Sequence, residues 1–313
     1  MTTNPSSTEQ INRDLFRPNR QLNKWVELVV KTIFALFALV SVATTIGIVL
    51  TLIFETFAFF SEIPIWRFLT DTQWTPRFFN PQYGIFVLIS ATLLTSTIAI
   101  SVALPVGLLS AICLSEYAPA KIRRWLKPAL EILAGVPTVV FGYFALLLVT
   151  PFLQKIIPGL QGFNALSAGL VLGVSIIPLV ASLSEDAIYA VPRSLREGAY
   201  ALGATKRETI VGVVLPSALS GIVASFVLAI SRAVGETMIV AIAAGQNPTL
   251  GLNPFVPVMT MTAYIVQASL GDTPAGSLAY RTLFAVGMTL FLITLALNIF
   301  SFWFVRRFRE KYE

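Results

Sequence analysis

The sequence predicts an all-α integral membrane protein that has six transmembrane helices and both termini in the cytoplasm. Of its 313 residues, 56% are hydrophobic and 12% are charged, whereas about a quarter of the residues in a soluble domain are charged. Six apolar segments are long enough to cross a hydrocarbon core of about 30 Å as helices. Lysine and arginine gather in the segments that this arrangement places on one side of the membrane, which sets the orientation.

The polar leader, residues 1–31, carries five basic residues and no cleavage-site pattern. We therefore expect a cytoplasmic leader followed by a transmembrane domain over residues 32–313, and not a removed signal peptide. Residues 32–54 contain no charged side chain and would form about 34 Å of helix, so they predict the first span. The other predicted spans are residues 85–114, 129–153, 166–183, 218–244 and 282–305.

The segments between the spans differ in composition on the two sides. Residues 57–84 are rich in aromatic residues and proline, which is typical of an exterior loop that touches the membrane interface. Residues 116–128 carry four basic side chains and are expected to form a cytoplasmic loop. Residues 155–165 and 245–281 complete the exterior side, and within the latter residues 258–270 are apolar enough to lie against or dip into the bilayer.

The distribution of basic residues supports this topology. Of the 22 lysine and arginine residues, 17 lie in segments assigned to the cytoplasm, five in the leader and four in each of three other segments. Four more lie on the exterior side, and Arg232 lies within a span. The positive-inside rule therefore places both termini in the cytoplasm.

Proline and glycine interrupt two of the predicted spans. Pro105 and Gly107 lie near the inner end of the second span, where we expect a bend. Gly135 and Pro137 break the third span partway along. Breaks of this kind persist mainly where backbone is buried in protein or lines a cavity, so this position is a candidate gate. A simple proline kink is an equally good interpretation.

The polar loop, residues 184–216, separates the fourth and fifth spans. Its first part predicts a short helix that begins at Pro192 and ends at Gly203. The apolar face of this helix contains Leu195, Ala199 and Leu202. Thr205 and Glu208 have the spacing of a capping box, which opens a second helix. Two helices that meet at a glycine corner suit docking into a groove of a partner; an ordinary surface hairpin is the alternative.

The residue types exclude several kinds of chemistry. Histidine is absent and Cys113 is the only cysteine, which excludes disulfide frameworks, thiolate clusters and histidine-based zinc or triad sites. None of the seven lysines follows a glycine, so the chain lacks the Gly-Lys pair of a phosphate-binding Walker loop. We therefore expect no catalytic site, no metal site, no cofactor and no ATP hydrolysis in this chain. The net charge of +6 follows from topology, so nucleic acid is not an expected partner.

Two charged residues lie inside the fifth predicted span. Arg232 and Glu236 are four residues apart, which predicts that they share one face of a helix. Because a charge at mid-membrane costs about 2.5 to 3.5 kcal/mol on insertion scales, such side chains usually pair, face the bundle interior and mark a pathway. Arg232 has the planar donor geometry that suits an oxyanion, and Glu236 is expected to hold it when the path is empty. A structural ion pair between helices is the alternative.

The polar loop also contains a sequence signature. Glu197-Gly198-Ala199 is followed after three residues by Gly203, and after nine more by Val213-Val214-Leu215-Pro216. This order resembles the cytoplasmic signature of ABC-importer permeases, E-A-A, G and I-x-L-P, with glycine for the first alanine and valine for isoleucine. Residues 135–142, 184–205 and 232–237 resemble the phosphate-specific branch, and residues 114–119 and 271–278 resemble its C-type subunit, PstC. The similarity runs from about residue 32 to the C-terminus.

The resemblance implies a type I ABC-importer permease fold and a permease subunit of an importer of inorganic phosphate in the bacterial plasma (inner) membrane. The implied partners are an A-type sister permease, two copies of an ATPase subunit that bind ATP and Mg²⁺, a periplasmic phosphate-binding protein, phosphate and the lipid bilayer. The implied ATPase-coupling residues, within residues 197–216, are Glu197, Gly198, Ala199, Gly203, Leu215 and Pro216. Arg232 and Glu236 become the residues expected along the anion path.

Three other functions stay open on the sequence. A permease for another oxyanion, such as molybdate or sulfate, would share the fold and the coupling loop. An ATP-independent transporter or channel would have no use for a docking signature and commonly shows internal repeats, which we do not find between the two halves. A membrane-embedded enzyme fits least, because no nucleophile with a base and no set of metal ligands converges in the spans.

Overall fold

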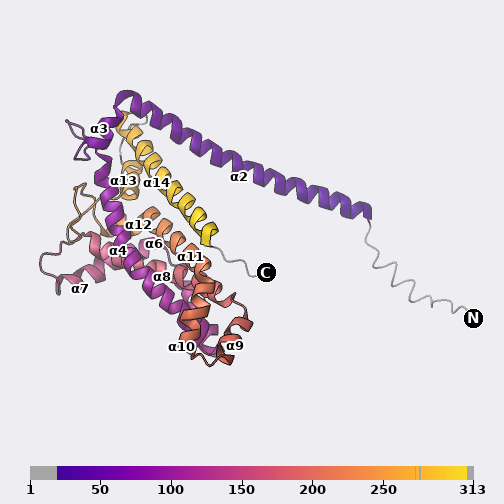
Figure 1. Ribbon diagram of the computed structural model, residues 1–313. Coiled ribbons are helices and arrows are strands. Elements are labelled where there is room, and N and C mark those ends of the chain that lie inside the picture. The colour runs from indigo at the N-terminus through magenta and orange to yellow at the C-terminus, as the bar shows by residue number, and fades with distance from the viewer. Residues whose placement is uncertain (1–19, 272, 275, 309–313) are drawn as a thin grey trace, which may run out of the picture. The chain divides into compact units, whose positions relative to one another are not determined.

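The computed structural model describes residues 20–271, 273–274 and 276–308 (Figure 1). Within these residues the regular structure is helical, apart from an isolated bridge between Trp74 and Tyr83. The chain divides into two units, Met1–Phe54 and Glu55–Glu313, which are described separately. Five described helices are long and apolar enough to cross a membrane, and a broken helix pair raises the number to six. These findings confirm the predicted all-α membrane fold, whereas the side on which the termini lie stays a prediction.

The first unit contains most of helix α2 (Arg20–Glu62), which continues into the second unit. This helix is long and apolar enough to span a membrane. The predicted first span, residues 32–54, lies within α2, and residues 1–19 of the predicted leader lie outside the described residues.

The second unit contains the remaining described helices and three π-helical turns. The helices are α3 (Ile65–Thr70), α4 (Ile85–Ile112), α5 (Ala120–Ala134), α6 (Thr138–Phe144), α7 (Thr150–Gln154), α8 (Ala165–Tyr189), α9 (Arg193–Ala201), α10 (Lys206–Thr209), α11 (Leu215–Gly235), α12 (Met238–Ala243), α13 (Met261–Leu270) and α14 (Leu278–Phe308). The π-helical turns are η1 (Cys113–Tyr117), η2 (Ala145–Val149) and η3 (Ile210–Val214). Predicted spans two, four and six correspond to α4, α8 and α14, and α4 runs through Pro105 without a break in the helix.

Helices α4 and α8 pack along each other at glycine residues. A Cβ atom added to Gly107 would lie 2.6 Å from the Cβ of Val180, and one added to Gly173 would lie 2.7 Å from the carbonyl oxygen of Ala99. Gly169 has a similarly close neighbour across the same contact. No side chain fits at these distances, so the two backbones approach this closely because the three residues are glycines. Small residues have this role at many helix contacts in membrane proteins.

A second buried cluster is rich in aromatic residues from the predicted exterior loop. Phe59, Phe68, Trp74 and Tyr83 are buried, and the Trp74 ring meets that of Tyr264 edge-on with centroids 5.0 Å apart. Burial raises the pKa of the Tyr83 and Tyr264 hydroxyls. Trp74 and Tyr83 therefore pack in the protein core, whereas Phe78 and Phe79 of the same loop are exposed, and the contact of this loop with the membrane interface stays a prediction.

Helix α13 accounts for the apolar segment 258–270. It packs against α4, α12 and α14, and Met261, Ala263 and Tyr264 are buried within the protein. The hydrophobic side chains that suggested contact with the bilayer therefore serve the core of the second unit.

The third predicted span differs most from the structure. Helix α5 occupies most of the predicted cytoplasmic loop 116–128 and continues to Ala134. The pair Lys121–Ala134 and Thr138–Gln154 is then bent by 86°. The predicted break of the third span at Gly135 and Pro137 is therefore confirmed, and the helical pair that contains this break begins at Lys121 and not at residue 129. Proline causes the break because it disfavours helical backbone in the residue that precedes it.

We expect Gly173→Ala to lower the thermal stability of the purified protein, because the added Cβ would lie 2.7 Å from a backbone oxygen. Overpacking of this kind typically costs about 1 to 3 kcal/mol. Gly212→Ala is the matched control, since no atom lies within 4 Å of its added Cβ and alanine favours helix. Thermal unfolding in detergent measures both variants, and equal melting temperatures would contradict the role given to the α4–α8 contact.

Candidate functional site

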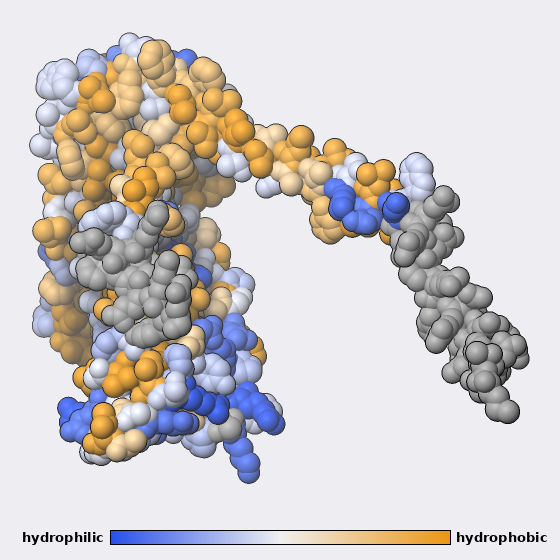
Figure 2. Space-filling view, turned by 45° about the vertical axis from the view of Figure 1, so that its right-hand side comes forward, coloured by the Kyte–Doolittle hydropathy of each residue, from blue (hydrophilic) through white to orange (hydrophobic). Residues whose placement is uncertain are grey.

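The polar loop folds as the predicted helical corner. Helix α9 begins after Pro192, and Gly203 follows its end with φ +83°, a left-handed conformation that favours glycine. The Thr205 hydroxyl accepts the N–H of Glu208, and the Glu208 carboxylate accepts the N–H of Thr205, which is the predicted capping box at the start of α10. Figure 2 shows hydrophilic side chains gathered at the end of the second unit where Figure 1 places α9 and α10.

The signature residues lie on or near the surface of this corner. Glu197, Gly198, Gly203 and Pro216 are exposed, and Ala199 and Leu215 are half-buried. The predicted apolar face is split, however, because Leu195 packs against the core whereas Leu202 is 90% exposed. Leu202 lies just past the last residue of α9, where the backbone leaves the helix and points this side chain outward. The corner therefore offers a partner both an exposed apolar side chain, Leu202, and an exposed charge, Glu197.

Arg196 fixes α9 to the rest of the unit, a role that the sequence analysis did not assign. Its Nε and Nη2 atoms donate to Glu116 Oε1 at 3.3 and 2.9 Å. Nη1 donates to the carbonyl of Val191 at 2.6 Å, and Nη2 also donates to the carbonyl of Ile188 at 2.9 Å. Both charged side chains are largely buried. Since Glu116 belongs to η1 and Ile188 to α8, one guanidinium joins three elements.

A second ion cluster joins α5 to α8. The Glu185 carboxylate is 1% exposed and forms ion pairs with Arg123 and Lys127, the latter at 2.8 Å. Lys127 also contacts Asp186 at 2.7 Å, and the Arg123 guanidinium lies over the Tyr189 ring at 4.4 Å. Removing Glu185 would leave Arg123 without a carboxylate partner among the described residues, so this carboxylate fixes the position of α5 against α8.

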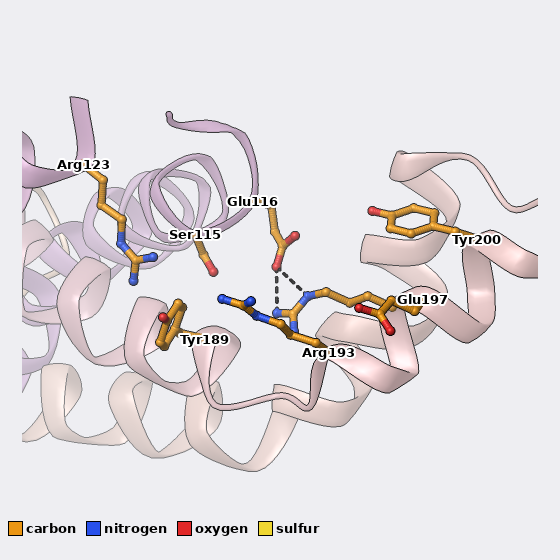
Figure 3. A pocket seen from close by; sticks show the side chains of 8 residues that line it. Ser115, Glu116, Arg123, Tyr189, Arg193, Glu197 and Tyr200 are labelled. Carbon is orange, nitrogen blue, oxygen red and sulfur yellow. Dashed lines mark hydrogen bonds and ion pairs between the residues drawn. The ribbon is translucent and has the colours of Figure 1, made fainter. Parts of the chain in front are cut away.

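A hollow of about 480 Å³ lies between these two ion clusters. It is lined by residues of η1, α5, the end of α8 and α9 (Figure 3), and the lining includes both Glu116 and Arg196. Arg193 and Glu197 of α9 also line it, and neither has an ion-pair partner among the described residues. The open side of α9 therefore carries unpaired charges of both signs, which suits docking of a charged partner surface.

Arg232 and Glu236 do not share a helix face. Helix α11 ends at Gly235, and Glu236 has extended backbone with ψ 135°. Its carboxylate accepts the N–H groups of Met238 and Ile239 at 3.1 and 3.4 Å, which opens α12. The predicted pairing is therefore wrong: Arg232 is exposed, and no ion pair joins it to Glu236 among the residues that the structure describes. The hydropathy of this segment did not reveal the break.

No group of three or more potential metal ligands occurs within the described part of the chain. The roles of Gly135 and Pro137 as a gate, and of Arg232 and Glu236 along a path, stay predictions. The described ion pairs identify Glu116, Glu185 and Arg196 as further residues of the site. Arg196 lies 80 residues from Glu116, and Arg123 lies 62 residues from Glu185, so no local spacing pointed to either contact.

Comparison with known proteins identifies the family. The family described as "Binding-protein-dependent transport system inner membrane component" matches residues 103–312. "Phosphate transport system permease protein PstC" of Haemophilus influenzae is 33% identical over 296 residues, which cover 88% of this chain and 92% of that protein. "Probable ABC transporter permease protein YqgH" of Bacillus subtilis is 34% identical over 281 residues, which cover 89% of each chain.

A solved structure of the inward-facing MetNI methionine ABC transporter contains a chain with the same fold. That chain is 21% identical with a TM-score of 0.53, and the match covers 72% of this chain and 95% of that one. The predicted type I ABC-importer permease fold and the multi-pass membrane class are thus confirmed. The chain belongs to the inner membrane components of binding-protein-dependent transport systems and, within them, to the PstC-type permeases.

Proposed function

We propose that the chain is the membrane-spanning permease subunit of an ATP-driven importer of inorganic phosphate in the bacterial inner membrane. The observation that carries this proposal is the helical corner, because its signature residues are exposed while Arg196 ties α9 to η1 and α8. The relatives named as phosphate transport permeases support phosphate as the substrate.

An ATPase subunit docks on α9 and the Gly203 corner, with Glu197, Gly198 and Ala199 of α9 and the nearby Leu215 and Pro216 as the coupling surface. When ATP closes two ATPase subunits, they displace α9. The Arg196 contacts pass this displacement to η1, which prolongs α4, and to the end of α8. The pathway then opens outward, and hydrolysis resets it. The ATP and Mg²⁺ are bound by the partner ATPases, so this chain is a transport subunit and not an enzyme.

The chain forms the pathway together with an A-type sister permease. The second unit leaves most of the apolar window of its own helix α14 unburied, which is consistent with a further membrane subunit. A periplasmic phosphate-binding protein delivers the anion to the exterior side. Gly135 and Pro137, at the 86° bend, are candidates for the gate.

Arg232 is the side chain that meets the anion. It lies in the last turn of an apolar helix, it is exposed in this chain, and no carboxylate pairs with it among the described residues. Its guanidinium is thereby free to donate two parallel hydrogen bonds to an oxyanion. Glu236 acts on the path indirectly, because it holds the start of α12 at the break beside Arg232.

We expect Arg232→Gln to reduce ATP-dependent uptake of radiolabelled phosphate into vesicles at least tenfold, since a hydrogen bond to a charged group is worth about 1.5 to 3 kcal/mol. The vesicles contain this chain with its co-purifying partners. Lys155→Gln, which removes an exposed charge from a loop, is the control and should keep uptake. If the vesicles transported molybdate or sulfate and not phosphate, the proposed coupling to ATP would stand, but the proposed substrate would be wrong. Uptake of every anion without ATP would reject the whole proposal.

We expect Gly203→Pro to abolish uptake while the protein still inserts, because proline cannot adopt the φ of +83° at this corner. Gly203→Asn should retain uptake, since asparagine tolerates the left-handed conformation.

We expect Glu197→Lys to block ATP-dependent uptake as well, because it reverses a charge on the docking surface. Glu197→Gln, which only removes that charge, should have a smaller effect. Normal uptake by both Gly203→Pro and Glu197→Lys would rule out docking at this corner.

We expect Arg196→Gln to lower the number of phosphate ions moved per ATP hydrolysed, because α9 would move without pulling η1. Docking of the ATPase should persist, since Arg196 is largely buried and turned toward Glu116. Glu116→Gln should have the same effect, and Arg193→Gln is a matched loss of charge on the same helix. The measurement is uptake and ATP hydrolysis in the same vesicles. If Arg196→Gln and Glu116→Gln both left the number of phosphate ions moved per ATP unchanged, the Arg196–Glu116 contact would not transmit the movement of α9 to η1.

A further inference from the structure

Helix α5 has a continuous apolar face that the protein leaves uncovered. Ile122, Trp125, Ala129 and Leu133 recur at spacings of three and four residues, so they share one face. Trp125 is 79% exposed, and Ile132, two turns further along the same face, is 73% exposed. A solvated helix would not present this surface to water, so the face requires an apolar neighbour.

The opposite face of α5 is basic and only partly neutralised. Arg123 and Lys127 are paired with the carboxylates of Glu185 and Asp186 on α8. Arg124, and Lys121 at the edge of the apolar face, are exposed and have no carboxylate partner among the described residues. An amphipathic helix with free cations beside a broad apolar face is typical of a helix that lies in the membrane interface.

The orientation of α5 fits this interpretation. The helix is bent by 86° from the following pair α6 and α7, which together with it make up the broken span. If the pair crosses the bilayer, α5 lies nearly parallel to the membrane surface. The positive-inside rule places its basic residues on the cytoplasmic side, where anionic lipids attract them.

Two hollows on α5 match the two parts of a phospholipid. One, of about 410 Å³, is apolar and lies between Leu109 and Cys113 on one side and Leu126 and Leu130 of α5 on the other. The second, of about 380 Å³, is lined by Arg123, Arg124 and Lys127 together with Pro128 and one carboxylate, Glu131. The first has the lining for an acyl chain, and the second has the donors for a phosphate group.

We propose that α5 is an interfacial helix that binds an anionic phospholipid of the cytoplasmic leaflet. The lipid phosphate lies beside Arg124, with Lys121 one turn away, and an acyl chain occupies the apolar hollow at Leu126 and Leu130. Because Arg123 and Lys127 join α5 to Glu185, the bound lipid also steadies the end of α8 that carries the coupling corner. The site does not depend on which anion the permease transports.

The test is native mass spectrometry of the full chain with its co-purifying partners, using phosphatidylglycerol or phosphatidylcholine with identical acyl chains. We expect phosphatidylglycerol to bind more tightly than phosphatidylcholine. The loss of either unpaired cation, Lys121 or Arg124, should weaken the binding of phosphatidylglycerol about fivefold. Lys121→Gln with Arg124→Gln should therefore abolish the preference. Lys155→Gln, which removes an exposed charge from a loop outside this helix, is the matched control. Leu130→Trp should weaken the binding of both lipids, because the larger side chain fills the apolar hollow without changing the charge.

Three results would overturn the proposal. The first is equal binding of the two lipids by the unmodified protein, a comparison that needs no variant to fold. The second is binding of inorganic phosphate as tight as that of phosphatidylglycerol, which would make the site one for a free oxyanion. The third is capture of the sister permease instead of lipid by a photoreactive group at position 125, which would assign the exposed face of Trp125 to a subunit contact. Capture of lipid at position 125 would support the proposal.

Discussion

The close approach of α4 and α8 is the contact on which the rest of the second unit depends. Glycine at 107, 169 and 173 removes the side chains that would hold the two backbones apart. The same helix pair then ends near the helical corner, where η1 prolongs α4 and provides Glu116, while α8 provides Glu185. Both ion clusters are therefore set by one packing contact that lies deeper in the protein.

The two clusters have different mechanical roles because their partners belong to different elements. Arg196 connects α9, the predicted docking helix, to η1 and α8, whereas Glu185 connects α8 to α5. Burying charge is costly, and an ion pair in the interior often adds little net stability compared with apolar packing. Here the ion clusters fix geometry: Arg196 and Glu185 each have several partners, so only one arrangement of the helices satisfies them all. A movement of α9 would therefore displace η1 and α8 through the contacts of Arg196.

The sequence predicted what local chemistry controls. Pro192, Gly203 and the Thr205–Glu208 box defined the corner because turn and capping preferences act over a few residues. The helical period of α5 was also present, but four basic side chains near Pro128 led to a predicted loop. The contacts of Arg196 and Glu185 could not be predicted, since they join residues 80 and 62 positions apart. The resemblance to ABC permeases gave the fold that composition alone left open.

The break between α11 and α12 shows why a hydropathy profile is an incomplete guide to a transport path. Ending a helix inside an apolar segment frees backbone groups that lipid cannot satisfy. Here the Glu236 carboxylate accepts two N–H groups at the start of α12, and the Glu236 carbonyl accepts the Thr262 hydroxyl at 2.7 Å. Glu236 is thus committed to the backbone and does not neutralise Arg232. Arg232 therefore has no carboxylate partner among the described residues and lies at a helix end next to a stabilised break, which fits the anion path proposed above.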